Sequence, residues 1–478
     1  MTAAAARLSG LRRDLPARAQ VVRAFGVLAI GGVLALCGWI PFDLQPHPGL
    51  DQSWVGALHM AAHSDLAWGR DLVFTYGPLG FLRLPAYWYG DTGALAIAYW
   101  LVVRVTAFAA LWLLARRAFG GVGAFVLLLL IVHELSEPLL PVAFAWGAWL
   151  LHRRPGPRAH TAFAVVVGAV GALELLAKVN NGVTILALGA VALLFVRADR
   201  WRWLLVFAGS ALFALLAGWL VTGQPLSALP DYLLNSARVT SGYSAAMNTD
   251  GDRWQITAAL VVFLLGAYGI WRIGEPGRAR RGMLALWLLL AFTQYKAAFV
   301  RHDAPHVIQY FAVLLPALVA LPWPRAMRPY ALATSAAALL VLVGLRGEPV
   351  TEFTQPWHRV SAARHDLGSL NDRAAKRAAG VAEVRNDAGL TPATLAALNG
   401  RTVHVAPYEA SVVWAYNLRW KPMPVFQSYQ AYTRGLDEVN ARALEKPSGP
   451  ERILLGAQPP VDGRVPGWES PAAVTAML

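Results

Sequence analysis

The sequence predicts a polytopic α-helical membrane protein of about 11 transmembrane helices, followed by a small C-terminal α/β domain. Hydrophobic residues make up 56% of the 478 positions and charged residues only 15%, which is too apolar for a soluble chain of this length. Mean hydropathy is +0.44. Apolar runs of about 20 residues also recur up to residue 345, and such runs are long enough to cross the roughly 30 Å hydrocarbon core of a bilayer.

Each predicted span corresponds to one of these runs. The nine clearest lie at 21–41, 93–115, 160–177, 181–196, 203–222, 255–273, 282–299, 307–324 and 329–345. Between 120 and 151 two acidic residues and two prolines interrupt the apolar pattern, at Glu134, Glu137, Pro138 and Pro141. We expect two short helices here that meet near the outer face, which brings the total to eleven. Because a charge that faces lipid is costly, Arg104 and Glu134 are expected to face protein or water.

Arginine clusters predict the orientation of the chain. If the N-terminus is cytoplasmic, the loops on that side hold most of the basic residues, at Arg116, Arg117, Arg153, Arg154, Arg158, Arg197, Arg200, Arg202, Arg272, Arg278, Arg280, Arg281, Arg325 and Arg328. The opposite loops hold few cations. This asymmetry predicts a multi-pass protein of the inner (plasma) membrane, with loop 43–92, loop 223–254, turn 300–306 and the C-terminal region outside. It also accounts for the net charge of +14 without nucleic acid as a partner.

Residues 346–478 differ from the predicted transmembrane domain, residues 1–345, by their frequent charges and their lack of a further span. Strands are predicted at 401–407, 423–428 and 451–456, and helices at 409–418 and 436–446. Thr391 is expected to cap another helix, with Pro392 at its first position and Gly400 at its end. This alternation predicts a small α/β domain outside the membrane.

The outer loop at 43–92 carries the densest set of reactive side chains. Asp51 comes a few residues after the first span, and Asp71 precedes a Tyr-Gly-Pro turn that begins at Tyr76. An exposed loop carboxylate is often only a solvated turn residue. Here, however, the carboxylates are held at the depth of the lipid head groups, and aromatic residues of the same loop suit the membrane interface. We therefore expect an active site in this loop.

The stretch GRDLVFTYGPL at 69–79, together with an Asp soon after the first span, resembles the integral-membrane glycosyltransferases of the GT-C superfamily. Members of that family take a sugar from a polyprenyl-phosphate carrier and attach it to an acceptor on the outer face of the membrane. The resemblance covers the topology of roughly the first 345 residues. It implies that Asp51 is the catalytic base and that Asp71, with Tyr76, shapes the site or binds the acceptor. Unlike the paired acidic residues common in the family, Asp51 is followed by Gln52.

A lipid-linked phosphate is already a competent leaving group, so one base and one or two cations suffice for transfer. The expected phosphate binders come from the outer end of the span at 282–299 and from the turn that follows, at Lys296, Arg301, His302 and His306. A basic cluster at the outer face calls for an anionic partner, and phosphate is the obvious one. Lys178 is a further candidate. The structural alternatives are that Lys296 and Arg301 only anchor the chain at the interface, and that Glu174 pairs with Lys178.

Histidine spacing leaves a metal site open. His59 with His63, and His302 with Asp303 and His306, have spacings that suit one helical face. A divalent cation that bridges the loop and the phosphate is therefore an open alternative, although histidine pairs at this spacing are common by chance.

The expected partners are a polyprenyl-phosphate-linked sugar donor, an envelope glycan, lipid or protein acceptor, and the bilayer itself. Two alternatives belong to other classes. A transporter or flippase is expected to show inverted repeats and helices broken at mid-membrane, and neither is seen in the sequence. A non-catalytic envelope assembly protein would be consistent with the missing second acidic residue. An enzyme should lose transfer on Asp51→Asn, whereas a transporter or scaffold should hardly respond.

Overall fold

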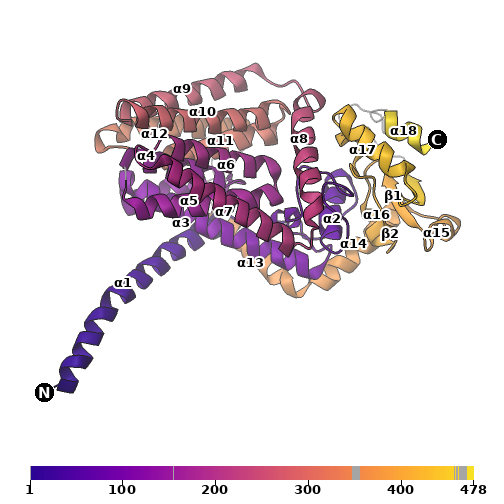
Figure 1. Cartoon of the computed structure of the whole chain (residues 1–478), viewed down its shortest axis with the longest axis horizontal. Helices are drawn as coiled ribbons and strands as arrows, with labels where there is room; N and C mark the ends of the chain where they lie inside the picture. Colours follow the sequence, from indigo (N-terminus) through magenta and orange to yellow (C-terminus); the bar gives the residue numbers. More distant parts are fainter. Residues whose placement is uncertain (1, 154, 347–355, 457, 459–460, 462–470) are drawn as a thin grey trace.

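The computed structural model describes residues 2–153, 155–346, 356–456, 458, 461 and 471–478, with side chains from residue 19 onward. Long helices form a bundle that makes up most of the molecule, and three short strands lie beyond one end of it (Figure 1). The first helix, α1 (Thr2–Cys37), projects from the bundle at its N-terminal end.

Seven helical segments of the described chain are long and apolar enough to cross a bilayer. They are Ala19–Cys37 of α1, α3 (Gly90–Leu129), α5 (Pro157–Ala177), α7 (Arg200–Val221), α9 (Arg253–Ile273), α10 (Arg278–Phe299), and Arg325–Arg346, which comprises η3 (Arg325–Met327) and α12 (Arg328–Arg346). Large apolar side chains stay exposed on them, among them Leu205, Phe213 and Leu340 at 74%, 75% and 71%. Such a surface suits lipid. The chain is therefore a multi-pass helical membrane protein, as predicted.

Three shorter helices, α4 (Leu139–Arg153), α6 (Val179–Leu194) and α11 (Ala304–Val319), complete the bundle. The interrupted region between 120 and 151 is built much as the sequence predicts. α3 has a non-helical residue at Gly120, whose φ of 77° favours glycine, and the chain turns at 130–138 before α4 begins.

The two charges that were expected to avoid lipid do so. Arg104 is 1% exposed and donates hydrogen bonds of 2.8–2.9 Å to three backbone carbonyls, those of Gly38, Val132 and Leu135. Glu134 is buried and accepts a hydrogen bond of 2.5 Å from Arg346. Both charges therefore face protein.

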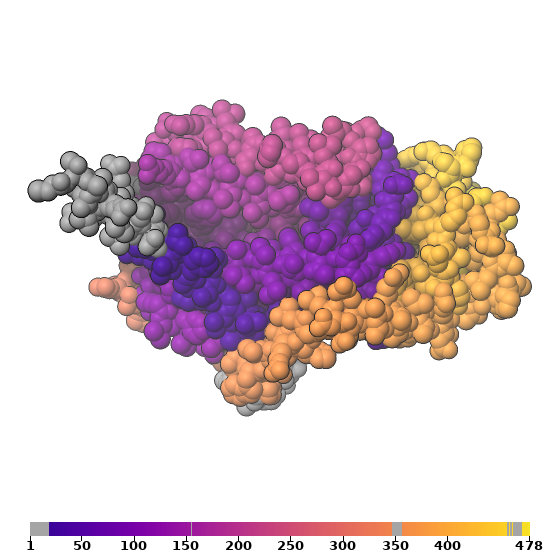
Figure 2. All heavy atoms as spheres, turned by 90° about the horizontal axis from the view of Figure 1, so that it is seen from below, coloured from indigo at the N-terminus to yellow at the C-terminus, as the bar shows by residue number. Residues whose placement is uncertain are grey.

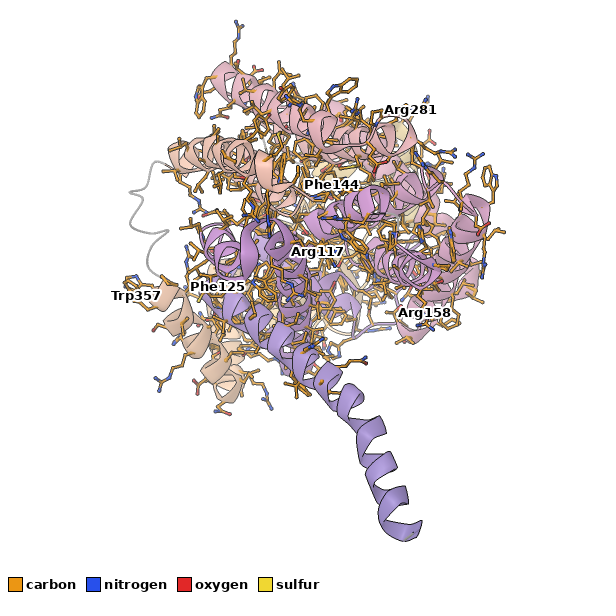
Figure 3. The ribbon with its side chains drawn as sticks, turned by 90° about the vertical axis from the view of Figure 1, so that its left-hand side faces the viewer. Arg117, Phe125, Phe144, Arg158, Arg281 and Trp357 are labelled. Atoms are coloured by element: carbon orange, nitrogen blue, oxygen red, sulfur yellow. The ribbon has the colours of Figure 1, made fainter. Side chains whose placement is uncertain are left out.

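Arginines are found at the end of the bundle that is away from the strands. Figure 3 looks onto this end and labels Arg117, Arg158 and Arg281 there. α5 is 21 residues long, with Arg158 in its first turn and Ala177 at its end, so its C-terminus lies about 30 Å from the arginine end of the bundle.

The outer loop at 43–92 is folded rather than extended. It contains α2 (Leu50–Ala61) and the 3-10 helix η1 (Gly80–Arg83). It also pairs with the C-terminal region, because Val73 N donates to Pro424 O at 2.7 Å and Ser53 Oγ donates to Tyr408 O at 2.5 Å. Side chains of the two segments share one apolar cluster, which includes Leu58, Trp68, Trp88, Val405, Trp414 and Phe426. The outer loop is thus held between the bundle and the C-terminal residues.

The predicted outer loop at 223–254 contains η2 (Leu226–Ala228) and α8 (Leu229–Ala246), and α8 lies between the bundle and the C-terminal helices (Figure 1). The remaining elements are α13 (Pro356–Gly368), η5 (Ser369–Asn371), α14 (Arg373–Ala388), α15 (Pro392–Leu398), α16 (Ser411–Ala415), η6 (Ser428–Gln430), α17 (Arg434–Glu445) and α18 (Pro471–Met477). Figure 2 shows these C-terminal residues, orange to yellow, gathered at one end of the bundle, with an orange segment extending along its side. The predicted boundary at 345/346 adjoins residues 347–355, which lie outside the described part.

The sheet is small and parallel. Its strands are β1 (Thr402–Ala406), β2 (Arg419–Trp420) and β3 (Arg452–Leu455), in the order β2-β1-β3. Two strands fall where the sequence predicts them, and Thr391 caps α15 by accepting from Thr394 N at 3.1 Å, also as predicted.

The third predicted strand, at 423–428, is wrong. The backbone there is bonded elsewhere, because Pro424 O accepts from Val73 and Val425 N donates to Asn440 Oδ1 at 2.8 Å. β2 therefore forms a few residues earlier, where Arg419 and Trp420 pair with the start of β1.

Candidate functional site

A cavity of about 400 Å³ lies where the end of α1, the outer loop, α3, the turn before α4 and the break between α5 and α6 meet. This volume falls in the range of small-molecule sites, about 300–1,000 Å³. Its wall consists of Ile40, Pro41, Phe42, Asp43, Gln52, Val55, Tyr76, Arg83, Leu84, Pro85, Ala86, Tyr99, Trp100, Val103, Arg104, Ser136, Glu137, Pro138, Leu139, Lys178 and Gln309. We call it the polar cavity, because two carboxylates and three basic side chains line it.

The Tyr-Gly-Pro turn of the outer loop fixes the position of Lys178. Lys178 has an extended backbone between α5 and α6, and its neighbour Val179 donates to Thr75 O at 3.2 Å. Tyr76 pairs with Lys178 in an antiparallel bridge, which places the Lys178 Nζ atom 5.7 Å from the centre of the Tyr76 ring. Two residues that were predicted to belong to one site thus meet in the polar cavity.

Glu137 joins three donors, one from the outer loop and two from the start of α6. Lys178 Nζ lies 2.9 Å from its Oε1, and Arg83 Nη2 and Asn181 Nδ2 both donate to Oε2. Burial alone would raise the pKa of Glu137, but the two neighbouring cations outweigh burial and lower that pKa to about 2. Glu137 is therefore a permanent anion that positions the cations beside it and is not available as a base.

Arg83 continues this network to a second carboxylate. Its Nη1 lies 2.6 Å from Glu174 Oε2, and the Tyr99 hydroxyl donates to Glu174 Oε1 at 2.5 Å. The suggested pairing of Glu174 with Lys178 is therefore wrong, since Glu174 points to Arg83 and Lys178 points to Glu137. Burial would lower the pKa of Arg83, but the two carboxylates raise it, so Arg83 stays charged.

Arg104 is the third cation in the wall. Its guanidinium lies 4.4 Å from the Trp100 ring and 5.0 Å from the Phe108 ring, and its Nε has no hydrogen-bond partner among the described residues. Unlike Arg83 and Lys178, Arg104 forms no ion pair with a carboxylate of the described chain; its other nitrogens bond to backbone carbonyls. A buried cation of this kind leaves positive charge available to an anionic ligand.

Asp43 supplies the accessible carboxylate of the cavity. Its side chain is 58% exposed, and it accepts from Gln52 Nε2 at 3.0 Å and contacts His47 Nε2 at 3.2 Å. The other ring nitrogen of His47 lies 2.8 Å from Glu383 of α14. Burial would lower the pKa of His47, but hydrogen bonding to Glu383 and the charge of Asp43 raise it. Asp43 is thus held in place by the His47 ring and by the Gln52 amide, and its side chain stays more than half exposed.

Asp51, the predicted base, lies in the first turn of α2. Its Oδ1 accepts from Trp54 Nε1 at 3.0 Å, and among the described residues it is not part of the cavity wall. Asp71, the predicted acceptor ligand, lies 2.9 Å from Lys421 Nζ and accepts from Ala67 N at 3.0 Å. Neither Asp51 nor Asp71 lines the polar cavity; the carboxylate that the outer loop contributes to its wall is that of Asp43.

The basic turn at 300–306 is largely paired with itself and its neighbours. Asp303 lies 3.1 Å from Arg301 Nε and 2.5 Å from His306 Nδ1, and His302 Nε2 contacts Gln255 at 2.8 Å. Lys296 is half-buried on α10.

Gln309 connects that turn to the polar cavity. It lines the cavity and lies three residues after His306 on α11, which is less than one helical turn. The turn at 300–306 and Asp43 are therefore at the same end of the bundle.

The histidines that were considered as metal ligands have other partners. His59 contacts Thr92 Oγ1 at 2.7 Å and Leu84 O at 3.0 Å, and His63 lies 3.2 Å from Asp91. Over the described residues, no group of three or more His, Cys, Asp or Glu is placed to hold a metal ion. The buried contacts of His59 give it a structural role that its spacing did not reveal.

Sequence reasoning missed four side chains of the cavity or its network, namely Asp43, Arg83, Tyr99 and Glu137. A signal existed for Glu137, because a carboxylate within an apolar stretch needs a cationic partner. Arg83 offered the complementary signal as a cation at the end of the outer loop. Asp43 and Tyr99 are brought to the cavity only by the fold.

No protein-family model and no curated protein matches the sequence. The function is therefore argued from the polar cavity itself.

Proposed function

We propose that the chain is a membrane glycosyltransferase of the GT-C type, which moves a sugar from a polyprenyl-phosphate donor to an envelope glycan, lipid or protein acceptor at the outer face. The observation that carries this proposal is the pairing of one accessible carboxylate, Asp43, with three basic side chains in a single cavity, namely Arg83, Arg104 and Lys178. Such a cavity combines the two functions that transfer from a phosphate carrier needs.

The base is assigned to Asp43. In transfer to an acceptor hydroxyl, the base accepts the proton as the oxygen attacks the anomeric carbon, while the bond from that carbon to the carrier phosphate breaks. Asp43 is half-exposed and keeps lone pairs beyond those bonded to Gln52 and His47, whereas Glu137 is saturated by donors. Asp51 remains the alternative base.

The departing phosphate is proposed to bind to the three basic side chains of the polar cavity, Arg83, Arg104 and Lys178. Arg83 and Lys178 are held by Glu137, so their positions are fixed before a ligand binds. Preorganised cations stabilise the charge that develops on a leaving phosphate more effectively than mobile ones. Arg104, which has no carboxylate partner in the described chain, adds charge that a phosphate can neutralise. The apolar part of the wall, with Phe42, Trp100 and Val103, suits the first units of a polyprenyl chain.

The proposed topology has eleven crossings, a cytoplasmic N-terminus, and the polar cavity and C-terminal region outside. Three of the predicted cytoplasmic arginines, Arg117, Arg158 and Arg281, lie at the end of the bundle opposite to the C-terminal strands, which supports this orientation. A donor carried by a lipid would then reach the cavity from the outer leaflet.

A complementation experiment tests the proposal. In a strain that lacks the gene, mass analysis of envelope glycans should show a missing glycosyl unit, which the wild-type protein restores. Asp43→Asn should fail to restore it at equal protein level, because an amide cannot accept the proton. Asp65→Asn, a loop carboxylate that does not line the cavity, is the matched control and should restore it.

The same experiment discriminates the alternatives. If Asp43→Asn restores the glycan fully, Asp43 is not the base, and failure of Asp51→Asn would move the assignment to that residue. If neither variant has an effect, the transfer proposal fails and a transporter or a non-catalytic assembly protein is favoured.

A further inference from the structure

A second pocket of about 380 Å³ lies where the outer loop, α8 and the C-terminal region meet. The charged residues of its wall are Arg70, Asp71, Asp231, Lys421, Arg442 and Lys446. We call it the outer pocket. Four of its residues are basic and two are acidic, so it has an excess of positive charge.

Two of the four basic residues, Arg70 and Lys421, form close ion pairs with the carboxylates of the wall, and Arg442 and Lys446 do not. Arg70 Nε lies 2.6 Å from Asp231, and Lys421 Nζ lies 2.9 Å from Asp71. These pairs use both carboxylates of the wall, and they join the outer loop to α8 and to the C-terminal region. The positive charge that remains available in the outer pocket is therefore that of Arg442 and Lys446.

Arg442 lies in the last turn of α17 and Lys446 directly follows that helix, and both line the outer pocket. Arg442 is loosely paired with Glu438, at 3.8 Å, and its side chain is 57% exposed. The side chain of Lys446 has no ion-pair partner in the described chain. One loosely paired cation and one without an ion pair in the described chain lie beside the prolines at 422, 424 and 450, and such a wall suits a charged group next to a sugar ring.

The outer pocket lies close to the polar cavity along the chain. Asp71 lines the outer pocket and Tyr76 lines the polar cavity, so five residues connect the two and their Cα atoms are at most about 18 Å apart. Val73, between them, is bonded to Pro424 of the outer-pocket wall. A linear glycan a few sugars long spans such a distance.

We propose that the outer pocket binds an anionic glycan, whose carboxylate or phosphate groups lie against Arg442 and Lys446. This inference rests on the proposed transfer and names its acceptor class, since the glycan would extend from the outer pocket to place its terminal hydroxyl beside Asp43.

The test is a binding measurement on the full chain in nanodiscs of zwitterionic lipid. Isothermal titration uses three probes, namely hexagalacturonate, phosphorylated maltohexaose and unmodified maltohexaose. The proposal expects at least one anionic probe to bind about tenfold more tightly than maltohexaose, because charge-assisted hydrogen bonds add to affinity. Preference for hexagalacturonate would identify carboxylate as the recognised group, and preference for phosphorylated maltohexaose would identify phosphate. Equal affinity for all three probes, or no binding, would overturn the proposal.

Two double variants test whether binding of the anionic probe depends on the charges of the outer pocket in particular. Arg442→Ala with Lys446→Ala should weaken binding of the anionic probe about tenfold. Arg434→Ala with Arg452→Ala removes the same charge from exposed positions outside the pocket and should leave the affinity unchanged. If both variants weaken binding equally, the attraction is a general charge effect and the outer pocket is not the site.

The Asp43→Asn variant separates this inference from the proposed function. It should bind the anionic probe as the wild type does, because Asp43 is not part of the outer pocket. Retained binding without transfer supports both proposals. A chain that transfers sugar but shows no selective binding of anionic probes contradicts only the outer-pocket inference.

Discussion

The Nζ atom of Lys178 lies 2.9 Å from Oε1 of Glu137, although the two residues are 41 positions apart in the chain. Their contact joins the break between α5 and α6 to the turn that precedes α4. Both side chains are largely buried. If one partner were removed, little water could therefore reach the other to solvate its charge. The polar cavity thus depends on a charge network that holds several segments together.

Glu137→Gln tests this network. It leaves Lys178 and Arg83 with one buried anion fewer, so the free energy of unfolding should fall by about 3 kcal/mol. Thermal unfolding of the protein in detergent measures the effect. Glu438→Gln, which removes an exposed carboxylate on α17, should change stability by less than about 0.5 kcal/mol. Equal melting temperatures for Glu137→Gln and the wild type would show that the network does not stabilise the fold.

Gly77→Ala tests the close packing of the Tyr-Gly-Pro turn. A Cβ atom at this position would clash with Tyr232 Oη and would lie 2.5 Å from Leu176 O, so the turn must shift away from the break at Lys178. We expect destabilisation of about 1–3 kcal/mol together with weaker donor binding. Gly368→Ala, where no atom lies within 4 Å of the added Cβ, is the control and should leave both unchanged. Wild-type behaviour of Gly77→Ala would contradict the close approach of this turn to Tyr232 and Leu176.

Asp366→Ala tests how the Asp43 segment is positioned. Asp366 Oδ2 accepts from Trp39 Nε1 at 2.8 Å and from Phe42 N at 3.0 Å, so it fixes the backbone immediately before Asp43. Loss of this buried acceptor should cost about 1–3 kcal/mol of stability and should lower the transfer rate more than donor affinity. Asp372→Ala, an exposed neighbour, is the control. An unchanged transfer rate in Asp366→Ala would show that Asp43 does not need this support.

The bundle could be predicted because hydropathy is a local property of the sequence. Runs such as 160–177 and 255–273 correspond closely to α5 and α9. The turn at 130–138 was also indicated, by the charges and prolines that interrupt the apolar pattern, whereas the kink at Gly120 was not. Long-range pairings leave no such local signal. Asp71 and Lys421, which meet at 2.9 Å, are 350 residues apart, and neither residue type reveals the other.

The lack of a local signal for long-range contacts also explains why Asp51, and not Asp43, was predicted as the base. Both aspartates follow the first span closely, and the resemblance to a known family implied Asp51 as the base, although Gln52 follows it where a second acidic residue is common in that family. Only the fold shows that Gln52 and His47 turn toward Asp43, and that Asp51 is bonded to Trp54. The missed strand at 419–420 has a similar cause, because two residues are too few for an alternating pattern.

His47 predicts a pH dependence of stability. Its pKa is raised in the folded protein, so protonated His47 stabilises the fold fully below its unfolded pKa of about 6.5. The contribution is lost as the pH rises through the raised folded value. Comparison of wild type with His47→Gln should therefore show a larger difference in melting temperature at pH 5.5 than at pH 9. A difference that stays constant, or grows with pH, would contradict the contacts with Asp43 and Glu383.

The central claim is that the polar cavity holds the phosphate of a polyprenyl donor, and photo-cross-linking tests it most directly. A photoreactive analogue of undecaprenyl phosphate is activated with the full chain in nanodiscs, and the labelled peptides are identified by mass spectrometry. We predict labels at 40–43, 83–86 or 99–104, all competed by unlabelled undecaprenyl phosphate. Competed labels confined to other segments, or no competed label at all, would contradict the claim.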